Sequence, residues 1–487
     1  MREILIPSGA SIALNTLREN GFDAYVVGGC VRDSLLGLAP KDWDICTSAT
    51  PDEVKHCFSE RKIVETGVQH GTVTVCIGEA SFEITTLRTD GVYSDNRRPD
   101  SVEFVGDIIL DLSRRDFTMN AMAYNDELGL IDPFDGQSSI RDRVISCVGD
   151  PEDRFGEDAL RILRALRFAS VYDFSISAHT AMSIHRNSGA LRHIAKERIN
   201  QELCKLLRGD GVLYVLQSYH DVFTKIIPEL AECVGFTQNN CFHQYDVYDH
   251  IAHAVANYRG DDDVVNLALL FHDIGKPRCY SEDERGGHFH YHNIPGAEIT
   301  RSNMNRLRFD HTTRNDVVEL VYYHDASVAP TCRSVRRWLN KLGEKQFLRL
   351  MDVKLADMLA HTDGTQDVRI EQRNQILEIA KQVIESNQCF SLKDLAVNGN
   401  DVIRDGIPEG PMVGIALQVA LDGVIEETVP NRKQELLDYI HAYMGFVRKY
   451  VDIPLSESEP FCPFCGVGYC SVAFSSYCYS CEVPMQD

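Results

Sequence analysis

The hydrophobic pattern of this 487-residue chain changes near Phe155, and that change constrains the fold more than any other feature. Before it, short helical patterns alternate with extended segments such as GTVTVCIG and SFEITTLR, which predict paired strands. After it, apolar residues recur every three or four positions, as in ERINQELCKLL and RKQELLDYIHAYMGFVRKY. We therefore expect an α+β head with a mixed sheet, followed by helical domains without strands.

Local signals mark the first helices and the ends of domains. A helix is expected from about Ser8 to Asn20, ended by Gly21, and Thr50 with Glu53 forms a capping box that opens another helix. At roughly 100 to 200 residues per domain, this length predicts about three domains or more. Gly, Pro, Asp and Glu interrupt the helical pattern at three expected linkers, near residues 145–153, 233–242 and 453–461.

Composition excludes some classes of protein. The net charge of −23 argues against a surface that binds nucleic acid everywhere. Residues 154–208 nevertheless hold ten Lys and Arg against five Asp and Glu, so RNA contact would be local, unless these are only solvated arginines on helices. No apolar run approaches the roughly 18 residues of a membrane span, and the start lacks a signal peptide. We expect a cytoplasmic protein without membrane contact, whose scattered cysteines are reduced.

Two aspartates after a double glycine form the first candidate site. In GGCVRDSLLGLAPKDWDICT, Asp42 and Asp44 are two positions apart on an expected strand, so both carboxylates would point to one face and repel each other unless a cation lies between them. Mg²⁺ is the natural occupant. Glu83, on a neighbouring strand, could be a third ligand or simply an exposed acid. Three further residues would contact a triphosphate, namely Gly28 and Gly29 through their backbone and Arg32 through its charge.

The bare Asp-x-Asp pair is more often two solvated acids than a metal site. The double glycine fourteen residues upstream of Asp42 reverses that preference. Six blocks then occur in the order and spacing of one family: GGCVRDSLLG with KDWDI, TGVQHGTVTV, RRDFTMNAMAY, DPFDG, EDALRILRALRFA and ERINQELCKLL. With these blocks, the chain resembles the class II tRNA nucleotidyltransferases, which include CCA-adding enzymes and bacterial poly(A) polymerases.

The resemblance covers most of residues 20–450 and implies a polymerase-β-like nucleotidyltransferase head followed by an all-helical neck, body and tail. Together with the expected linkers it predicts five domains. These are a head, a helical neck, an HD body, a helical tRNA-binding tail and a small four-cysteine zinc ribbon, with boundaries at residues 1–145, 146–235, 236–370, 371–455 and 456–487.

The resemblance assigns nucleotide selection to the block of Glu157, Asp158 and Arg161. Residues 158 and 161 would share one helix face. Asp158 could accept from the amino group of cytosine or adenine while Arg161 donates to the adjacent ring nitrogen. Uracil and guanine present the reverse order and would leave buried groups unpaired. The alternative is an ordinary ion pair between the two residues, but Arg164 and other arginines at near-helical spacing favour selection.

The block RRDFTMNAMAY resembles the part that holds the sugar and triphosphate. Asp116 could accept from ribose hydroxyls, Arg114 and Arg115 could face phosphates, and Asn120 could bond the hydroxyl that DNA precursors lack. The alternative is a turn leading into an apolar strand. Between the strands, TDGVYSDNRRPDSVEF is expected to be a loop. In the family such a loop accompanies the final A addition, so its presence favours complete CCA addition.

Histidines and aspartates farther along the chain resemble the metal ligands of an HD phosphohydrolase domain. These six residues are His250, His272, Asp273, His292, His324 and Asp357. They suit a borderline divalent metal such as Mn²⁺, Fe²⁺, Ni²⁺ or Zn²⁺, which could activate water for attack on a phosphoester. Lys276 could contact phosphate, and His288 or His290 could replace His292. An HD-like body that only packs or holds tRNA is the alternative.

The last 26 residues contain two Cys-x2-Cys pairs, and this spacing predicts a structural Zn²⁺ with four thiolate ligands, Cys462, Cys465, Cys478 and Cys481. For the whole chain we expect Mg²⁺-dependent addition of C, C and A to the 3′ end of tRNA from CTP and ATP, with release of pyrophosphate. A poly(A) polymerase, an HD phosphohydrolase and an RNA-binding scaffold are the alternatives. The sequence indicates no particular protein partner.

Overall fold

The computed structural model describes residues 4–65, 67–68, 71–91, 102–239, 243–284, 286–362, 364 and 366–450, together with two short strands near the C-terminus. The chain divides into two compact units. Unit 1 comprises Met1–Ala326 and Leu348–Glu371, and unit 2 comprises Ser327–Phe347 and Gln372–Asp487. In the described part of the chain, no helix has the length and apolar character that a membrane crossing requires.

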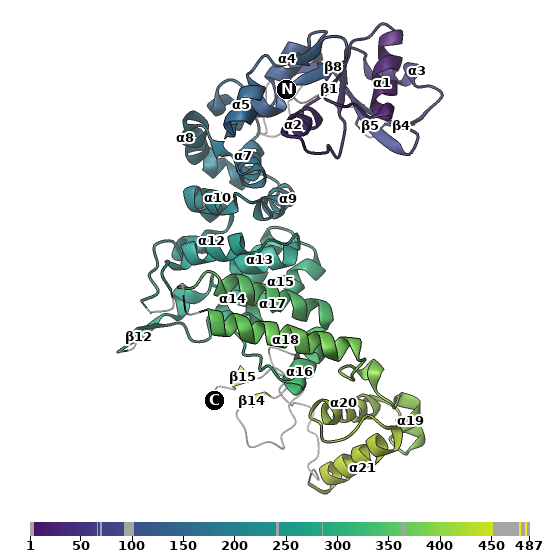
Figure 1. Ribbon diagram of the computed structural model, residues 1–487, viewed down its shortest axis with the longest axis vertical. Helices are drawn as coiled ribbons and strands as arrows, with labels where there is room; N and C mark the ends of the chain where they lie inside the picture. The colour runs from purple at the N-terminus through teal and green to yellow at the C-terminus, as the bar shows by residue number, and fades with distance from the viewer. Residues whose placement is uncertain are drawn as a thin grey trace. The chain divides into compact units, whose positions relative to one another are not determined.

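Unit 1 begins with a seven-stranded mixed sheet in the order β3-β4-β5-β2-β1-β8-β9 (Figure 1). Strands β2 and β5 run parallel and the other neighbours are antiparallel. The predicted mixed sheet and the predicted pairing of β4 with β5 are confirmed. The strands are β1 (Ala24–Val27), β2 (Ile45–Thr47), β3 (Lys62–Val64), β4 (Thr72–Ile77), β5 (Ala80–Thr86), β8 (Ala123–Asn125) and β9 (Gly129–Ile131).

Alternating side chains of β1 enter two different cores because successive residues of a strand point to opposite faces. Ala24 and Val26 join the core beneath α1 (Ser8–Glu19) and α3 (Pro51–Cys57). Tyr25 and Val27 join a second core with α4 (Ile108–Ser113). The predicted first helix and the capping box of Thr50 with Glu53 are both present. The sheet is therefore covered on both faces, which fixes its loop ends as the place for polar side chains.

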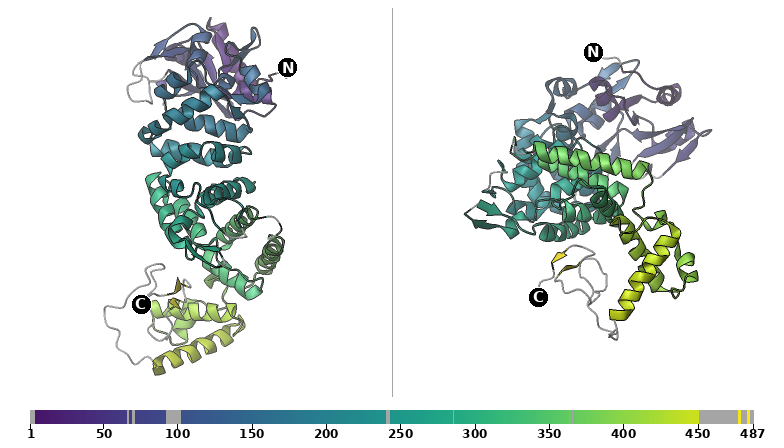
Figure 2. Two further views of the ribbon diagram at one scale, coloured as in Figure 1. Left: turned by 90° about the vertical axis from the view of Figure 1, so that its left-hand side faces the viewer. Right: turned by 60° about the horizontal axis from the view of Figure 1, so that its bottom comes forward.

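Helices follow the sheet in unit 1 (Figure 2). The predicted single helix through EDALRILRALRFA is wrong, because the chain is extended at Asp158 and separates α6 (Pro151–Glu157) from α7 (Leu160–Tyr172). The Asp158 carboxylate accepts from the Leu160 amide at 3.0 Å and so caps the second helix. Further neck helices are α8 (Ala178–Asn187), α9 (Lys196–Leu207), α10 (Val212–Ser218) and α11 (His220–Ile226).

Strands do not disappear entirely after Phe155, contrary to the prediction. A parallel pair joins β10 (Val144–Ile145) to β11 (Ser175–Ile176), and a hairpin joins β12 (Ser281–Asp283) to β13 (Gly286–His288). These strands have two or three residues, too few to produce a visible alternation. The loop predicted over residues 89–104 is wrong at its two ends, where β6 (Arg88–Asp90) pairs with β7 (Val102–Phe104), and residues 92–101 lie outside the described residues.

The remaining helices of unit 1 surround a histidine-rich centre. They are α12 (Val247–Asn257), α13 (Asp263–Phe271), α14 (Asn293–Arg306), α15 (His311–Tyr323) and α17 (Glu344–Met358). The head also contains α2 (Gly29–Leu36) and α5 (Gly136–Asp142). Helix α13 is buried from Val264 to Phe271, and His272 follows its last residue directly, as predicted for the His-Asp pair at a helix end.

Unit 2 has its own apolar core, which includes Leu421, Val424, Leu436 and Ile440. Its helices include α16 (Cys332–Leu342), α19 (Gly399–Arg404), α20 (Pro411–Ile425) and α21 (Lys433–Tyr450). Helices α17 and α18 (Asp367–Glu385) both cross a boundary between the two units, so residues 344–347 of α17 belong to unit 2. Strands β14 (Tyr477–Cys478) and β15 (Val483–Pro484) pair, but Cys462, Cys465 and Cys481 of the predicted zinc ribbon lie outside the described residues, as does the side chain of Cys478.

Candidate active site and metal cluster

A cleft of about 730 Å³ lies between the head sheet and the neck helices of unit 1. All but one of the head and neck residues predicted for catalysis or nucleotide binding line it, and the exception is Glu157. The thirteen lining residues are Gly28, Gly29, Arg32, Asp42, Asp44, Glu83, Arg114, Arg115, Asp116, Asn120, Asp158, Arg161 and Arg164. The motifs, together with the family resemblance, therefore pointed to residues that the fold brings together from more than 130 positions apart.

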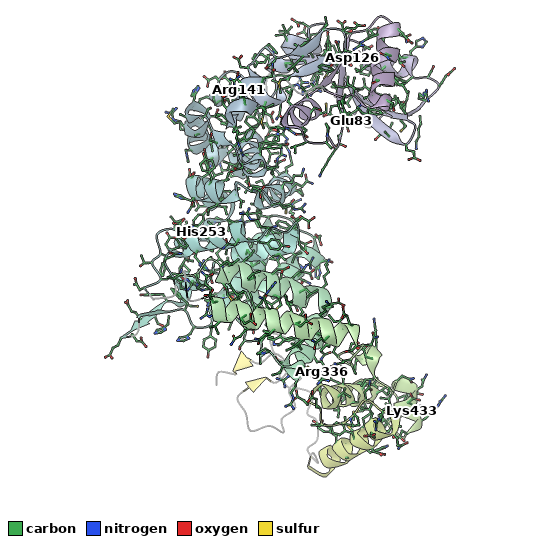
Figure 3. All side chains as sticks on the ribbon, in the orientation of Figure 1. Glu83, Asp126, Arg141, His253, Arg336 and Lys433 are labelled. Carbon is green, nitrogen blue, oxygen red and sulfur yellow. The ribbon has the colours of Figure 1, made fainter. Side chains whose placement is uncertain are left out.

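The acid pair does not lie on a strand as predicted, because β2 begins only at Ile45. The backbone of Asp44 still continues the ladder, since its carbonyl accepts from the Val27 amide at 3.0 Å. Ile45 pairs with Ile84 in parallel register, which sets Asp44 beside Glu83. Desolvation within the cleft, together with the charges of Glu83 and Asp42, raises the pKa of the Asp44 carboxyl, although Arg115 opposes this shift. Glu83 is labelled in Figure 3.

Gly28 and Arg32 shape the wall next to the acids. Gly28 has φ +73°, a conformation that favours glycine, and a Cβ there would lie 2.8 Å from the Arg115 Nη1 atom. Arg32 donates to the Asn120 Oδ1 atom at 2.6 Å, and its guanidinium lies 5.2 Å from the ring centre of Phe168. A cation held between an aromatic face and an amide has few alternative positions, so the wall is preorganised.

Asp116 already has partners on both carboxylate oxygens. Its Oδ1 atom accepts from Asn120 Nδ2 at 3.1 Å and its Oδ2 atom pairs with Arg164 Nη2 at 2.6 Å. Burial alone would raise the pKa of Asp116, but Arg164 and Asn120 outweigh it and lower the pKa to about 2. The carboxylate therefore holds two other cleft residues in place.

Sequence reasoning missed Asp111, whose side chain is wholly buried behind the cleft. It accepts from Arg114 at 2.6 Å and from Arg115 at 3.1 Å. Burial opposes ionisation of Asp111, but the two guanidinium groups prevail and lower its pKa. The spacing of three and four residues in DLSRR was the available signal.

The neck contributes two charged groups that do not pair with each other. Asp158 pairs with Arg198 at 2.9 Å, whereas Arg161 pairs with Glu157 and donates to the carbonyl oxygen of Arg114 at 3.1 Å. The ordinary ion pair that was the alternative for Asp158 and Arg161 is thus absent. Sequence reasoning missed Arg198, which the i, i+4 spacing with Glu202 on α9 could have indicated.

The HD residues form a second, separate cluster. Asp273 lies at its centre, with its Oδ2 atom 3.3 Å from both His250 Nε2 and His272 Nε2. Its Oδ1 atom lies 3.3 Å from His292 Nε2 and 3.6 Å from His324 Nε2. The six predicted ligands are completed by Asp357, whose Oδ1 atom is 2.9 Å from His250 Nε2. One carboxylate can therefore bridge two groups of ligands, as a dinuclear metal site requires.

The two carboxylates of this cluster give it a strongly negative electrostatic environment. Burial alone would lower the pKa of His272, but the negative charges of Asp273 and Asp357 raise it to about 10. Lys276, predicted to contact phosphate, instead lies 2.7 Å from the Asp273 Oδ2 atom. His292 joins the cluster, whereas its proposed substitute His288 pairs with Asp283 on the β12–β13 hairpin.

Comparisons with known proteins agree with both sites. The family model "Poly A polymerase head domain" matches residues 24–146, "Probable RNA and SrmB- binding site of polymerase A" matches residues 173–233, and "HD domain" matches residues 242–361. A CCA-adding enzyme of Lactobacillus delbrueckii subsp. bulgaricus is 34% identical over 437 residues, which cover 88% of this chain and 96% of that protein.

Solved structures give the same result. The Bacillus stearothermophilus CCA-adding enzyme in complex with CTP is 29% identical, with a TM-score of 0.69 over 92% of this chain and 100% of that one. The Thermotoga maritima CCA-adding enzyme complexed with tRNA shares the fold, with 21% identity and a TM-score of 0.56 over 91% of this chain and 97% of that one. The chain therefore belongs to the family of CCA-adding enzymes and is a nucleotidyltransferase that also carries an HD domain.

Proposed function

We propose that this chain adds C, C and A to the 3′ end of tRNA from CTP and ATP, with release of pyrophosphate. The observation that supports this proposal is one cleft lined both by three acids of the head and by two charged residues of the neck, Asp158 and Arg161. The 3′-hydroxyl of the tRNA attacks the α-phosphorus of the nucleotide, a new phosphodiester bond forms, and pyrophosphate leaves. Relatives named for CCA addition, and solved structures of such enzymes with CTP and with tRNA, support this proposal.

The head acids fit a magnesium site. Asp42, Asp44 and Glu83 offer only hard oxygen donors, all three are exposed to the cleft, and their mutual repulsion is part of the raised pKa of Asp44. Asp42 and Asp44 would hold the ion, with Glu83 as the third ligand. When bound, Mg²⁺ supplies positive charge that favours the ionised 3′-hydroxyl and the departing pyrophosphate.

The opposite wall holds the triphosphate and ribose. Gly28 and Gly29 begin α2, where a backbone without side chains lets phosphate oxygens approach closely. Arg32 and Arg115 supply positive charge. Both oxygens of Asp116 and the Oδ1 atom of Asn120 are already engaged. We therefore assign Asp116 to holding Asn120 and Arg164, and assign the second N–H of the Asn120 amide to the ribose hydroxyl.

Selection of the base rests on Asp158 and Arg161. The carboxylate accepts from the amino group of cytosine or adenine, and the guanidinium donates to the adjacent ring nitrogen. UTP or GTP would place acceptor against acceptor and donor against donor, at a cost of about 1 to 3 kcal/mol for each unpaired group. Asp158 must exchange Arg198 for the base, so Arg198 holds the carboxylate in place until the nucleotide arrives.

The decisive experiment supplies the purified chain with tRNA stripped of its 3′ end. Each nucleoside triphosphate is offered alone, and then CTP and ATP are offered together. We expect addition of C, C and A and then arrest. Repeated addition of A without use of CTP would identify a poly(A) polymerase instead, and no incorporation of any nucleotide would leave an RNA-binding scaffold.

The buried cluster favours a second function, metal-dependent phosphoester hydrolysis. Five of its side chains are at most 8% exposed, and the donors are imidazole and carboxylate, the set preferred by Mn²⁺, Fe²⁺, Ni²⁺ and Zn²⁺. Those five residues are His250, His272, Asp273, His292 and His324. Hydrolysis of bis(p-nitrophenyl) phosphate with each metal tests this function, since the Asp273→Asn variant should lose it and the Asp42→Ala variant should keep it. Loss in neither or in both would reject an independent HD activity.

We propose two further roles from the sequence alone. The helical tail, residues 371–455, binds the tRNA acceptor end, where shape and 2′-hydroxyl contacts can provide recognition. The four cysteines Cys462, Cys465, Cys478 and Cys481 hold one structural Zn²⁺. A truncation after Tyr450 with a zinc count before and after it tests the second role.

A further inference from the structure

Two histidines outside the predicted HD ligands lie beside His250. His243 precedes α12 and His361 follows α17. The ring centre of His243 is 4.9 Å from that of His250 and 4.6 Å from that of His361. The ring centres of His250 and His361 are 5.2 Å apart. One ring nitrogen from each residue lies within 4.8 Å of those of the other two. The fold thus gathers three imidazoles at one place from two separate loop segments and a helix.

The ring nitrogens there lack the hydrogen bonds that burial demands. Within the part of the chain that the structure describes, the buried Nδ1 atoms of His243, His250 and His361 have no hydrogen-bond partner. His250 is wholly buried, and its Nε2 atom is already engaged by Asp357 at 2.9 Å. An unpartnered buried nitrogen costs free energy, and three of them in one cluster indicate a missing ligand that accepts lone pairs.

We propose that His243, His250 and His361 form a further site for one divalent transition metal beside the HD centre. His250 is shared: its Nδ1 atom would serve this site while its Nε2 atom faces the HD centre, so its ring would give up its proton to solvent and bridge the two as an imidazolate. The three donors are all imidazole, so the site selects Zn²⁺, Ni²⁺, Co²⁺ or Cu²⁺ over Mg²⁺. Nitrogens about 2.1 Å from one metal lie about 3.4 Å apart, so the rings of His243 and His361 must move inward by roughly 1 Å. Both residues lie outside helices, where side-chain rotation can supply that movement. Neither nucleotide addition nor HD hydrolysis requires this metal.

The test counts Zn²⁺ bound to the full chain after removal of metals with a chelator and dialysis against excess Zn²⁺. His243→Gln and His361→Gln should each bind one ion fewer than the wild type. The Asp273→Asn variant should lose the ions of the HD centre, and the double variant Asp273→Asn with His243→Gln should lose one more. His253→Gln, on α12 and labelled in Figure 3, is the matched control, because His253 stacks on Tyr245 instead and should leave the count unchanged.

Several results would overturn the proposal. These are an unchanged count in His243→Gln and His361→Gln, a loss of more than one ion in either, or no further loss in the double variant. Every variant keeps the C-terminal cysteines, so those contribute equally to each count. Nucleotide incorporation at the head cleft verifies folding. As a second measurement, the Co²⁺ spectrum of the wild type minus that of His361→Gln should contain visible d–d bands, and a flat difference would also reject the site.

Discussion

The head cleft and the HD cluster both gather acids for a cation, yet they do so in opposite ways. Asp42, Asp44 and Glu83 are exposed to the cleft and offer only oxygen donors. His272 and Asp273 are almost wholly buried in a cluster dominated by imidazole. Exposure suits a hard ion that exchanges and keeps several waters, whereas burial suits a borderline ion that stays in place. The two proposed metal sites therefore differ in burial and in donor type.

The largest effect is expected from removing a head acid, which tests whether the head cleft works independently of the HD cluster. Asp44→Asn keeps the shape and removes one charge, so we expect nucleotide addition to fall roughly 10³-fold, equivalent to about 4 kcal/mol of transition-state stabilisation. Single-turnover addition to tRNA measures the loss, and HD metal content should not change. Asp126→Asn, an exposed acid in the β8–β9 turn labelled in Figure 3, is the control and should retain full activity. A similar loss in both variants would deny Asp44 a special role.

The reciprocal change is Asp273→Asn in the buried cluster. Because Asp273 touches both groups of ligands, we expect its loss to lower phosphoester hydrolysis by more than the roughly 100-fold seen for outer-shell partners, with loss of bound metal. Nucleotide addition should continue at the wild-type rate. If addition collapsed as well, the two sites would not be independent, and the comparison would fail.

A smaller effect tests selection of the base. Asp158→Ala or Arg161→Ala should each reduce the preference for CTP over UTP by about 5- to 150-fold, since each removes the penalty of roughly 1 to 3 kcal/mol for an unpaired group. Competition between the two nucleotides in one reaction gives the ratio directly. Arg141→Ala, an exposed arginine of α5 labelled in Figure 3, is the matched control. An unchanged ratio in the two neck variants would assign selection elsewhere.

The smallest expected effect separates stability from chemistry. Thr50→Ala removes one half of the capping box of α3 and should lower the free energy of unfolding by about 1 kcal/mol. Denaturant unfolding followed by circular dichroism measures it. Nucleotide addition and phosphoester hydrolysis should both be unchanged at 25 °C, since Thr50 lines neither site. A change in nucleotide addition would mean that the position of the head acids depends on α3.

Sequence patterns identified the residues of both sites better than the backbone that carries them. Asp42 and Asp44 were expected on a strand, and Asp158 with Arg161 on one helix. Both expectations extended the spacing of nearby apolar residues to polar residues, whose own backbone conformation that spacing does not determine. The actual break at Asp158 depends on its own side chain capping α7. The main helices and the β4–β5 strands followed from periodicity because their apolar side chains recur at the helical or strand spacing.

Other features had no local signal at all. Asp357 and His250 are 107 positions apart, and only the resemblance to HD domains joined them in advance. Arg198 meets Asp158 across 40 positions, and His243 and His361 became visible only as neighbours in space. Contacts of this kind depend on how helices pack, which a single sequence does not encode as a repeat.

The division of the chain has a consequence for any attempt to dissect it. The backbone passes between the two units three times, near residues 326, 347 and 371, and α16 packs with α20 inside unit 2. A protease that cuts near residue 371 separates residues 372–487 from the rest of the backbone, but residues 327–347 of unit 2 stay covalently attached to unit 1, so the packing of α16 with α20 still holds the released fragment. Deleting everything after residue 371 would remove α20, which packs against α16, and a helix that loses apolar partners is prone to aggregate. Shortened versions should therefore remove residues 327–347 as well and bridge the gap with a flexible linker.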